Sequence, residues 1–118
     1  MQKVALITGT GSGIGKALAK LLLSEKYSVF GYSRTNQIKH ANFTFTKIDL
    51  SDLETVQKIK FPKIKATTEI LLVNNAATIG SIIPINKKSE NEIIGEYNLN
   101  IISPTLLSRK FINTYADN

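Results

Sequence analysis

The sequence predicts an α/β fold with a doubly wound parallel sheet, formed as a single domain over residues 1–118. Three observations predict it. Four short apolar runs suited to buried strands are spread along the chain, and segments suited to helices follow the first, third and fourth of them. A glycine-rich turn joins the first run to the first helical segment. Strands that alternate with helices in this way need crossover connections, which are right-handed in parallel sheets.

The first strand and helix flank the glycine-rich turn at residues 8–15. Four apolar residues at 4–7, bounded by the turn, are typical of a buried parallel strand. The following segment places apolar side chains at helical spacing, which predicts that one helix face packs inward. These side chains are Ile14, Ala17, Leu18, Leu21 and Leu22. A strand-to-helix turn of this kind presents free backbone N–H groups and a positive helix end to a phosphate.

The spacing of the glycines excludes two common phosphate motifs. A P-loop would need glycine at Thr10 and serine or threonine at Ala17. The G-x-G-x-x-G dinucleotide motif would need its last glycine at Ile14 or Lys16. The pattern that residues 8–15 do match is Thr-Gly-x-x-x-Gly-x-Gly.

That pattern resembles the glycine motif of the short-chain dehydrogenase/reductase family, and the resemblance covers the whole chain but only the first half of a family member. It implies a Rossmann-like sheet with four strands in the order 3-2-1-4. It also implies that the turn binds a nicotinamide dinucleotide. The residues expected to do so are Gly9, Ser12, Gly13, Ile14 and Gly15.

The second strand is expected at residues 28–33, and its end predicts the choice of cofactor. In a doubly wound sheet this strand tip meets the adenosine ribose, where an acid would bind a free 2′-hydroxyl. The chain has Arg34 there instead, flanked by the hydroxyls of Ser33 and Thr35. A guanidinium suits a phosphate, so the sequence favours NADP(H) over NAD(H). A methyltransferase, which the glycines at 11, 13 and 15 would also suit, usually needs an acid at this point.

The third strand is expected at residues 42–48, where apolar and polar residues alternate. It leads into Asp49 and Leu50. The resemblance implies that the Asp49 carboxylate accepts a hydrogen bond from the adenine amino group, and that the next backbone N–H serves a ring nitrogen. A Ser-x-x-Glu pattern at Ser51 and Glu54 predicts a capping box for the helix that follows.

The fourth strand is expected at residues 69–73 and leads into residues 74–77. This Asn-Asn-Ala-Ala segment is similar to the Asn-Asn-Ala-Gly segment of the family. The resemblance implies that Ala76 and Ala77 pack against adenine and ribose and that Asn75 stabilises the sheet. Ala77 replaces the expected glycine.

A long helix is expected after a second capping box at Ser89 and Glu92, with a bend at Pro104. Residues 97–103 resemble the family helix that carries a catalytic asparagine. The match falls on Asn100, with Asn98 as the rival assignment. In the family this asparagine lies at an irregular point of the helix and holds a water in the proton relay.

Composition narrows the class of protein. With 42% hydrophobic and 20% charged residues, the chain is typical of a globular protein. Its net charge of +6 is scattered along the sequence, which disfavours nucleic-acid binding. There is no cysteine, and the single histidine, His40, has no carboxylate near it in sequence, so no metal site is expected. No apolar run approaches the roughly 20 residues that span a bilayer, so a cytoplasmic protein is expected, with no room for a signal peptide.

The resemblance implies an oxidoreductase that transfers hydride between the nicotinamide and a small carbonyl or alcohol substrate. Residues 32–35 and 49–53 look most similar to carbonyl, benzil and sepiapterin-type reductases. The family's catalytic serine and Tyr-x-x-x-Lys have no match here. We therefore expect a truncated chain that is inactive alone, and the alternative is a non-catalytic nucleotide-binding or assembly module. The fourth strand would form an apolar edge, so a homo-oligomer is expected.

Overall fold

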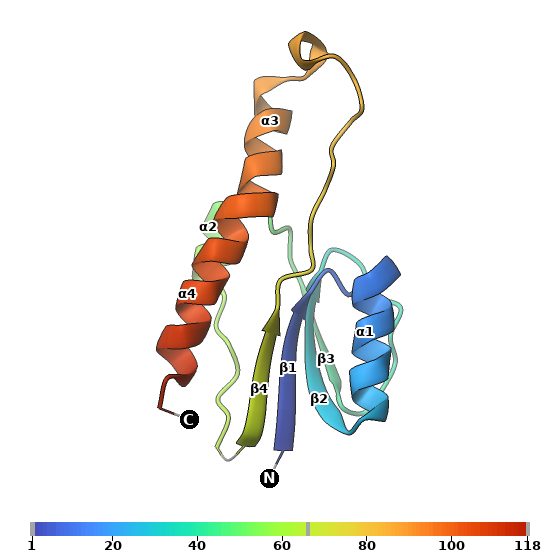
Figure 1. Ribbon diagram of the computed structural model, residues 1–118, viewed down its shortest axis with the longest axis vertical. Coiled ribbons are helices and arrows are strands. Elements are labelled where there is room, and N and C mark those ends of the chain that lie inside the picture. Colours follow the sequence, from blue (N-terminus) through green and yellow to red (C-terminus); the bar gives the residue numbers. More distant parts are fainter. Residues whose placement is uncertain (1, 66, 118) are drawn as a thin grey trace.

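The computed structural model describes residues 2–65 and 67–117, and its sheet has four parallel strands. The strands are β1 (Gln2–Thr8), β2 (Tyr27–Ser33), β3 (Phe43–Lys47) and β4 (Thr67–Val73). They lie in the order β3-β2-β1-β4, as Figure 1 shows, so the predicted strand order is confirmed. All four carboxyl ends therefore meet at one edge of the sheet.

Helices cover both faces of this sheet. Because side chains alternate along a strand, Ala5 and Ile7 of β1 point to one face and Val4 and Leu6 to the other. On the first face the core includes residues of α1 (Gly13–Ser24), and on the second it includes residues of α2 (Leu53–Lys58) and α4 (Ser103–Tyr115). This is the doubly wound arrangement that the sequence predicts.

The buried face of α1 differs from the predicted one. Gly15, Ala19 and Leu23 are its buried residues, whereas Ile14 is 79% exposed and Leu21 is 56% exposed. The helix lies so close to the turn before it that small residues form the contact. The predicted face was therefore rotated, although Leu18 and Leu22 do pack against the core at its edges.

The two capping boxes have different outcomes. Ser89 caps α3 (Glu90–Tyr97), since its hydroxyl accepts the backbone N–H of Glu92 at 3.1 Å, but the Glu92 side chain accepts hydrogen bonds from Ser81 instead of completing the box. At Ser51 the prediction is wrong, because α2 begins one residue later, at Leu53, with Asp52 before it. The Ser51 hydroxyl instead donates to the carboxylate of Asp49 at 2.7 Å.

The long helix is continuous but changes its winding. A π-helical segment, η2 (Asn98–Ile102), lies between α3 and α4, and the N–H of Ser103 bonds the carbonyl of Asn98, five residues back. Pro104 follows at the start of α4. The predicted irregularity is therefore present at residues 98–102. No helix in the described residues has both the length and the apolar character to cross a membrane.

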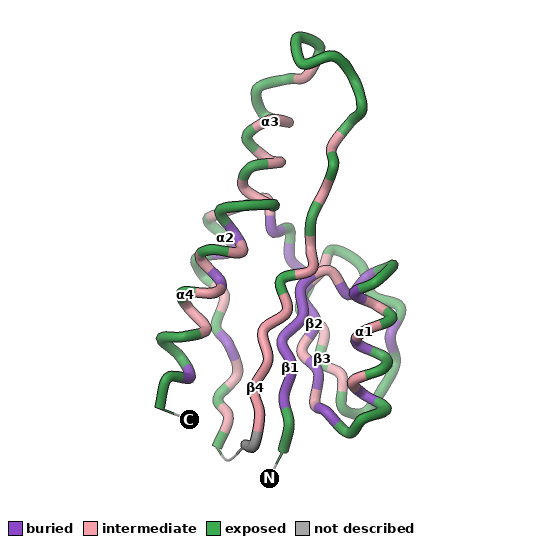
Figure 2. The backbone as a smooth tube through the Cα atoms, in the orientation of Figure 1, coloured by how far each residue is buried: buried purple, intermediate pink, exposed green. Residues whose placement is uncertain are grey.

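One part of the molecule projects beyond the sheet (Figure 1). We call residues 78–88 the strap, which includes the single turn η1 (Ile85–Lys87), and we call the strap together with α3 the arm. Figure 2 shows buried residues along β1 and β2, and exposed or half-buried ones along the arm. The overall extents of 53 × 29 × 17 Å reflect this projection.

Candidate cofactor site

A cleft of about 680 Å³ lies at the carboxyl ends of the strands. Open α/β sheets bind ligands at this edge, and the volume suits a cofactor. Ten of the predicted site residues line the cleft. They are Gly9, Ser12, Ser33, Arg34, Thr35, Asp49, Leu50, Asn75, Ala76 and Ala77. The structure thus brings predicted site residues from all four strand ends together in one cleft.

The β1–α1 turn provides one end of the cleft. Gly13 has φ +56° and faces open space, a backbone conformation that favours glycine and leaves room for a ligand. A Cβ at Gly15 would overlap the carbonyl oxygen of Gly9, so the first turn of α1 packs directly on the preceding turn. Gly13, Ile14 and Gly15 do not line the cleft themselves.

The N-terminus of α1 has no internal compensation for its positive end. Ser12 is the N-cap residue, but its side chain makes no capping hydrogen bond, and the first turn contains no acidic residue. The first N–H groups of a helix have no partner within the helix. This end of α1 is therefore suited to an anion from outside the chain.

Thr8 and Asn75 join the ends of β1 and β4. The Thr8 hydroxyl accepts the backbone N–H groups of Asn75 and Ala76, each at 3.0 Å. In return the Asn75 amide donates to the carbonyls of Thr8 and Gly9 at 3.2 Å. Both amide hydrogens of Asn75 are engaged in this way, so its side chain holds the turn in place.

The end of β2 lies against the glycine turn. A Cβ at Gly11 would come within 2.6 Å of the Thr35 hydroxyl oxygen and 2.7 Å of the Ser33 hydroxyl oxygen. Arg34 between them is exposed and lines the cleft. The following loop is fixed by Ile38, which is buried in the core beside α1. The two hydroxyls thus lie beside the glycine turn, and Arg34 lines the same cleft.

Asp49 lies at the end of β3 as an ionised acceptor. The Ser51 hydroxyl and the Ser51 backbone N–H donate to its Oδ1 at 2.7 and 3.0 Å. These hydrogen bonds, with a smaller contribution from the charge of Arg34, hold the pKa of Asp49 below its ordinary value. The carboxylate is exposed, so its second oxygen remains available as an acceptor in the cleft.

The π segment directs its two asparagines to different neighbours. The Asn98 amide donates to the carbonyl of Ser51 at 3.1 Å. Asn100 pairs with the backbone of Thr78, accepting its N–H at 2.9 Å and donating to its carbonyl at 2.7 Å. Pro104 has no N–H, so it cannot give the α-helical hydrogen bond to the carbonyl of Asn100.

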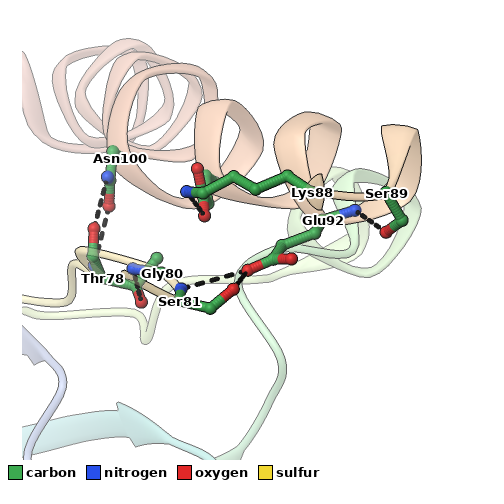
Figure 3. Close-up of polar contacts among 8 residues, drawn as sticks. Thr78, Gly80, Ser81, Lys88, Ser89, Glu92 and Asn100 are labelled. Carbon is green, nitrogen blue, oxygen red and sulfur yellow. Dashed lines mark hydrogen bonds and ion pairs between the residues drawn. The ribbon is translucent and has the colours of Figure 1, made fainter. Parts of the chain in front are cut away.

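The arm forms a wall of the cleft that the sequence prediction missed. Its lining residues are Thr78, Gly80, Glu92, Gly95 and Glu96, followed by Leu99 of the π segment. Figure 3 shows the strap fastened to the helix by side chains spaced four residues apart. Glu92 accepts the N–H and hydroxyl of Ser81, and Lys88 forms an ion pair with Glu96 at 2.7 Å.

A sequence signal for this wall did exist. Glu92, Glu96 and Asn100 are each four residues apart, and side chains at that spacing share one helix face. Three polar side chains on one face of a helix with apolar neighbours indicate a polar partner. The identity of that partner, the strap, depends on the folded arrangement.

Known proteins are similar to this chain in sequence or in fold. The chain is 32% identical over 123 residues to the benzil reductase ((S)-benzoin forming) of Bacillus cereus, across 93% of this chain and 49% of the relative. Its fold matches a short-chain dehydrogenase/reductase from Burkholderia vietnamiensis with a TM-score of 0.84 at 24% identity, covering 98% of this chain and 58% of that one. It also matches 4-hydroxyisoleucine dehydrogenase complexed with NADH, with a TM-score of 0.78 at 24% identity, over 98% of this chain and 50% of that one.

The chain therefore spans about half the length of the relatives that it matches. A model of the family described as short chain dehydrogenase matches residues 3–118. With the glycine turn, the strand order and the cleft in place, this match extends over every element described above. The chain belongs to the short chain dehydrogenase family of oxidoreductases.

Proposed function

We propose that this chain is the NADP(H)-binding part of an oxidoreductase that transfers hydride between the nicotinamide and a small carbonyl or alcohol substrate. One observation carries the cofactor choice. Ser33, Arg34 and Thr35 line the same cleft as Ser12, the N-cap residue of the uncapped α1, and no acid follows β2. An acid at that position would repel a 2′-phosphate, whereas a guanidinium and two hydroxyls attract one.

The residues present fit a dinucleotide in charge and in space. Its pyrophosphate is an anion, and the free end of α1 with the open space at Gly13 suits an anion. Its adenine needs an acceptor for the amino group, which the ionised Asp49 supplies. Ala76 and Ala77 leave room for the ribose and base, because their side chains are single methyl groups. When bound, the nicotinamide supplies or accepts the hydride.

We assign the catalytic-asparagine role to Asn100 in preference to Asn98. Two contacts support the choice. The Asn98 amide donates to the carbonyl of Ser51, whereas Asn100 makes two hydrogen bonds to the backbone of Thr78 in the strap. The Asn100 carbonyl lacks an α-helical donor because Pro104 has no N–H. It is therefore suited to hold a water for proton transfer.

The relatives support a proposal for the substrate class. The Bacillus cereus relative is a benzil reductase that forms (S)-benzoin, so we propose an apolar ketone or diketone as the substrate of the whole protein. We further propose that residues 1–118 form one cofactor-binding domain of a cytoplasmic homo-oligomer. The apolar residues of β4 are only half-buried at the edge of the described sheet, and this supports association with another protein chain.

The cofactor proposal is tested by binding. NADPH should bind the 118-residue chain at least about tenfold more tightly than NADH, measured by isothermal titration. Arg34→Asp should remove this preference by placing an acid where the 2′-phosphate would lie. Arg109→Asp, at an exposed position on α4, is the matched control and should leave the preference intact. Equal binding of the two cofactors by the unaltered chain would refute the choice of NADP(H).

A second candidate function is a non-catalytic binding module. The absence of Tyr-x-x-x-Lys from the sequence favours it for these 118 residues. Loss of NADPH absorbance in the presence of benzil separates the two candidates. The isolated chain should bind NADPH without oxidising it, and turnover by the isolated chain would contradict the need for the family's missing residues.

A further inference from the structure

A lysine in the first turn of α1 has no acidic partner among the described residues. Lys16 lies four residues after Ser12, one turn further along the same face of α1. Helical side chains lean toward the N-terminus, so the Lys16 side chain extends toward the start of α1. Its ammonium donates to the side-chain carbonyl of Gln37 at 2.7 Å. The ion pairs within residues 2–65 and 67–117 join Lys58 to Glu54 and Lys88 to Glu96, so neither involves Lys16.

Neither Lys16 nor its partner Gln37 is among the residues that line the cleft, but each lies a few residues along the chain from a residue that does. Gln37 follows Thr35 by two residues, and Thr35 and Ser12 both line the cleft. The two walls are close together, since a Cβ on Gly11 would reach the Thr35 hydroxyl at 2.6 Å. The hydrogen bond from Lys16 to Gln37 therefore bridges the start of α1 and the loop after β2.

We propose that Lys16 is a specificity-determining residue, the second positive charge of the 2′-phosphate site, held on Gln37 until the phosphate binds. This inference rests on the proposed function, because it assumes a dinucleotide in the cleft. A phosphate monoester carries about −1.5 to −2 charges at neutral pH, and Arg34 supplies only one compensating charge. Gln37 is neutral, so exchanging it for a phosphate leaves no carboxylate unpaired.

Solvent exposure limits how much Lys16 can add to the affinity for the phosphate. Gln37 and Arg34 are exposed and Lys16 is half-buried, so the added attraction is partly screened by solvent and salt. An exposed charge pair of this kind changes binding by about fivefold. NADH lacks the 2′-phosphate, so its affinity should change by less than about twofold.

The test compares lysine variants by isothermal titration with NADPH, NADH and 2′,5′-ADP at low salt. Lys16→Met should weaken NADPH and 2′,5′-ADP about fivefold and leave NADH nearly unchanged. Lys16→Arg should retain the affinity because it keeps the charge. Lys20→Met is the control, because Lys20 is exposed and lies one helical turn further along α1. This variant should behave as the unaltered chain does.

The outcomes distinguish failure of the Lys16 role from failure of the proposed NADP(H) binding. If the unaltered chain prefers NADPH and Lys16→Met keeps the full preference, the role of Lys16 is refuted while NADP(H) binding stands. Equal weakening of NADH and NADPH by Lys16→Met would also refute it, since the lysine would then act on the shared part of the cofactor. If the unaltered chain does not prefer NADPH, the proposed function itself fails.

Discussion

The sheet and the arm form opposite walls of the same cleft, and different forces hold them. Leu6 and Ile7 of β1 are fully buried, as is Val29 of β2. No residue of the arm is buried, although Ile79 and Ile82 are large apolar side chains. The arm is instead fastened by hydrogen bonds and by one ion pair. Apolar burial thus sets the cofactor wall made by the strand ends, while polar contacts set the facing wall.

This difference predicts a difference in local stability. Regions with few buried apolar contacts open at a lower free energy than the core. The strap should therefore detach from α3 without unfolding of the sheet. Opening of the strap would widen the cleft while the glycine turn and the end of β2 keep their places.

The largest effect should come from matched truncations in the two regions. Leu6→Ala should lower the free energy of unfolding by about 2–5 kcal/mol, because it leaves a cavity in the core. Ile82→Ala should change it by less than about 0.5 kcal/mol, because Ile82 is 88% exposed. Urea denaturation measures both. Comparable losses would contradict the contrast between the two regions.

The second largest effect should be a loss of stability at alkaline pH, which acts on the core. Burial raises the pKa of Tyr115 to about 12, and burial with the nearby Tyr115 raises that of Tyr32 to about 12. A raised folded-state pKa contributes stability that is present below pH 10 and lost as pH rises to 12, by at most about 3 kcal/mol per group. Tyr115→Phe should reduce this loss in melting curves between pH 9 and 12. An unchanged pH dependence would mean that Tyr115 ionises equally in both states.

Asn100→Ala should loosen the strap and spare the sheet. The variant removes both hydrogen bonds to Thr78, which contribute about 1 kcal/mol each. Their loss lowers the free energy of local opening of the strap. Hydrogen exchange at the Thr78 amide should accelerate about fivefold or more, while exchange along β1 stays constant. Asn98→Ala, the matched control, removes the bond to Ser51 and should leave the Thr78 amide unaffected. Equal acceleration in β1 would show that the arm and the sheet open together.

The smallest effect should come from lowering the pH, which protonates the Glu92 carboxylate in the arm. Hydrogen bonds from the hydroxyl and then from the backbone N–H of Ser81 lower the pKa of the half-buried Glu92 carboxyl below 4.5. A depressed folded-state pKa contributes stability present above pH 4.5 and lost as pH falls through the lower value. The Ser81 amide shift should therefore titrate below pH 4.5 in NMR spectra. Glu92→Gln should remove this titration, and its persistence would place the titrating group elsewhere.

Strand order and the position of the site were predictable because they rest on local patterns. The glycine spacing at residues 8–15 and the apolar runs placed the turn at the strand ends, and the structure has it there. The irregular helix near Asn100 was likewise expected from the resemblance of residues 97–103, and the structure has π geometry at that point. The roles of the individual cofactor-site residues remain predictions.

Packing distance and long-range contacts were not predictable. The inward face of α1 was misplaced because periodicity counts large apolar residues, whereas two of the three residues that α1 buries are the small Gly15 and Ala19. Ser51 matched a capping pattern, but Asp49 two residues earlier competes for its hydroxyl. The contact of Glu92 with Ser81 depends on where the strap returns, and no local pattern encodes that path.

The turn between β1 and α1 is proposed to bind an anion beside the end of β2. Titration of the isotope-labelled chain with NADPH, followed by backbone amide NMR, tests it most directly. The largest shift changes should fall at residues 11–15 and 33–35, with residues 108–115 of α4 unchanged. Changes confined to the arm, or none at residues 11–15, would contradict the account.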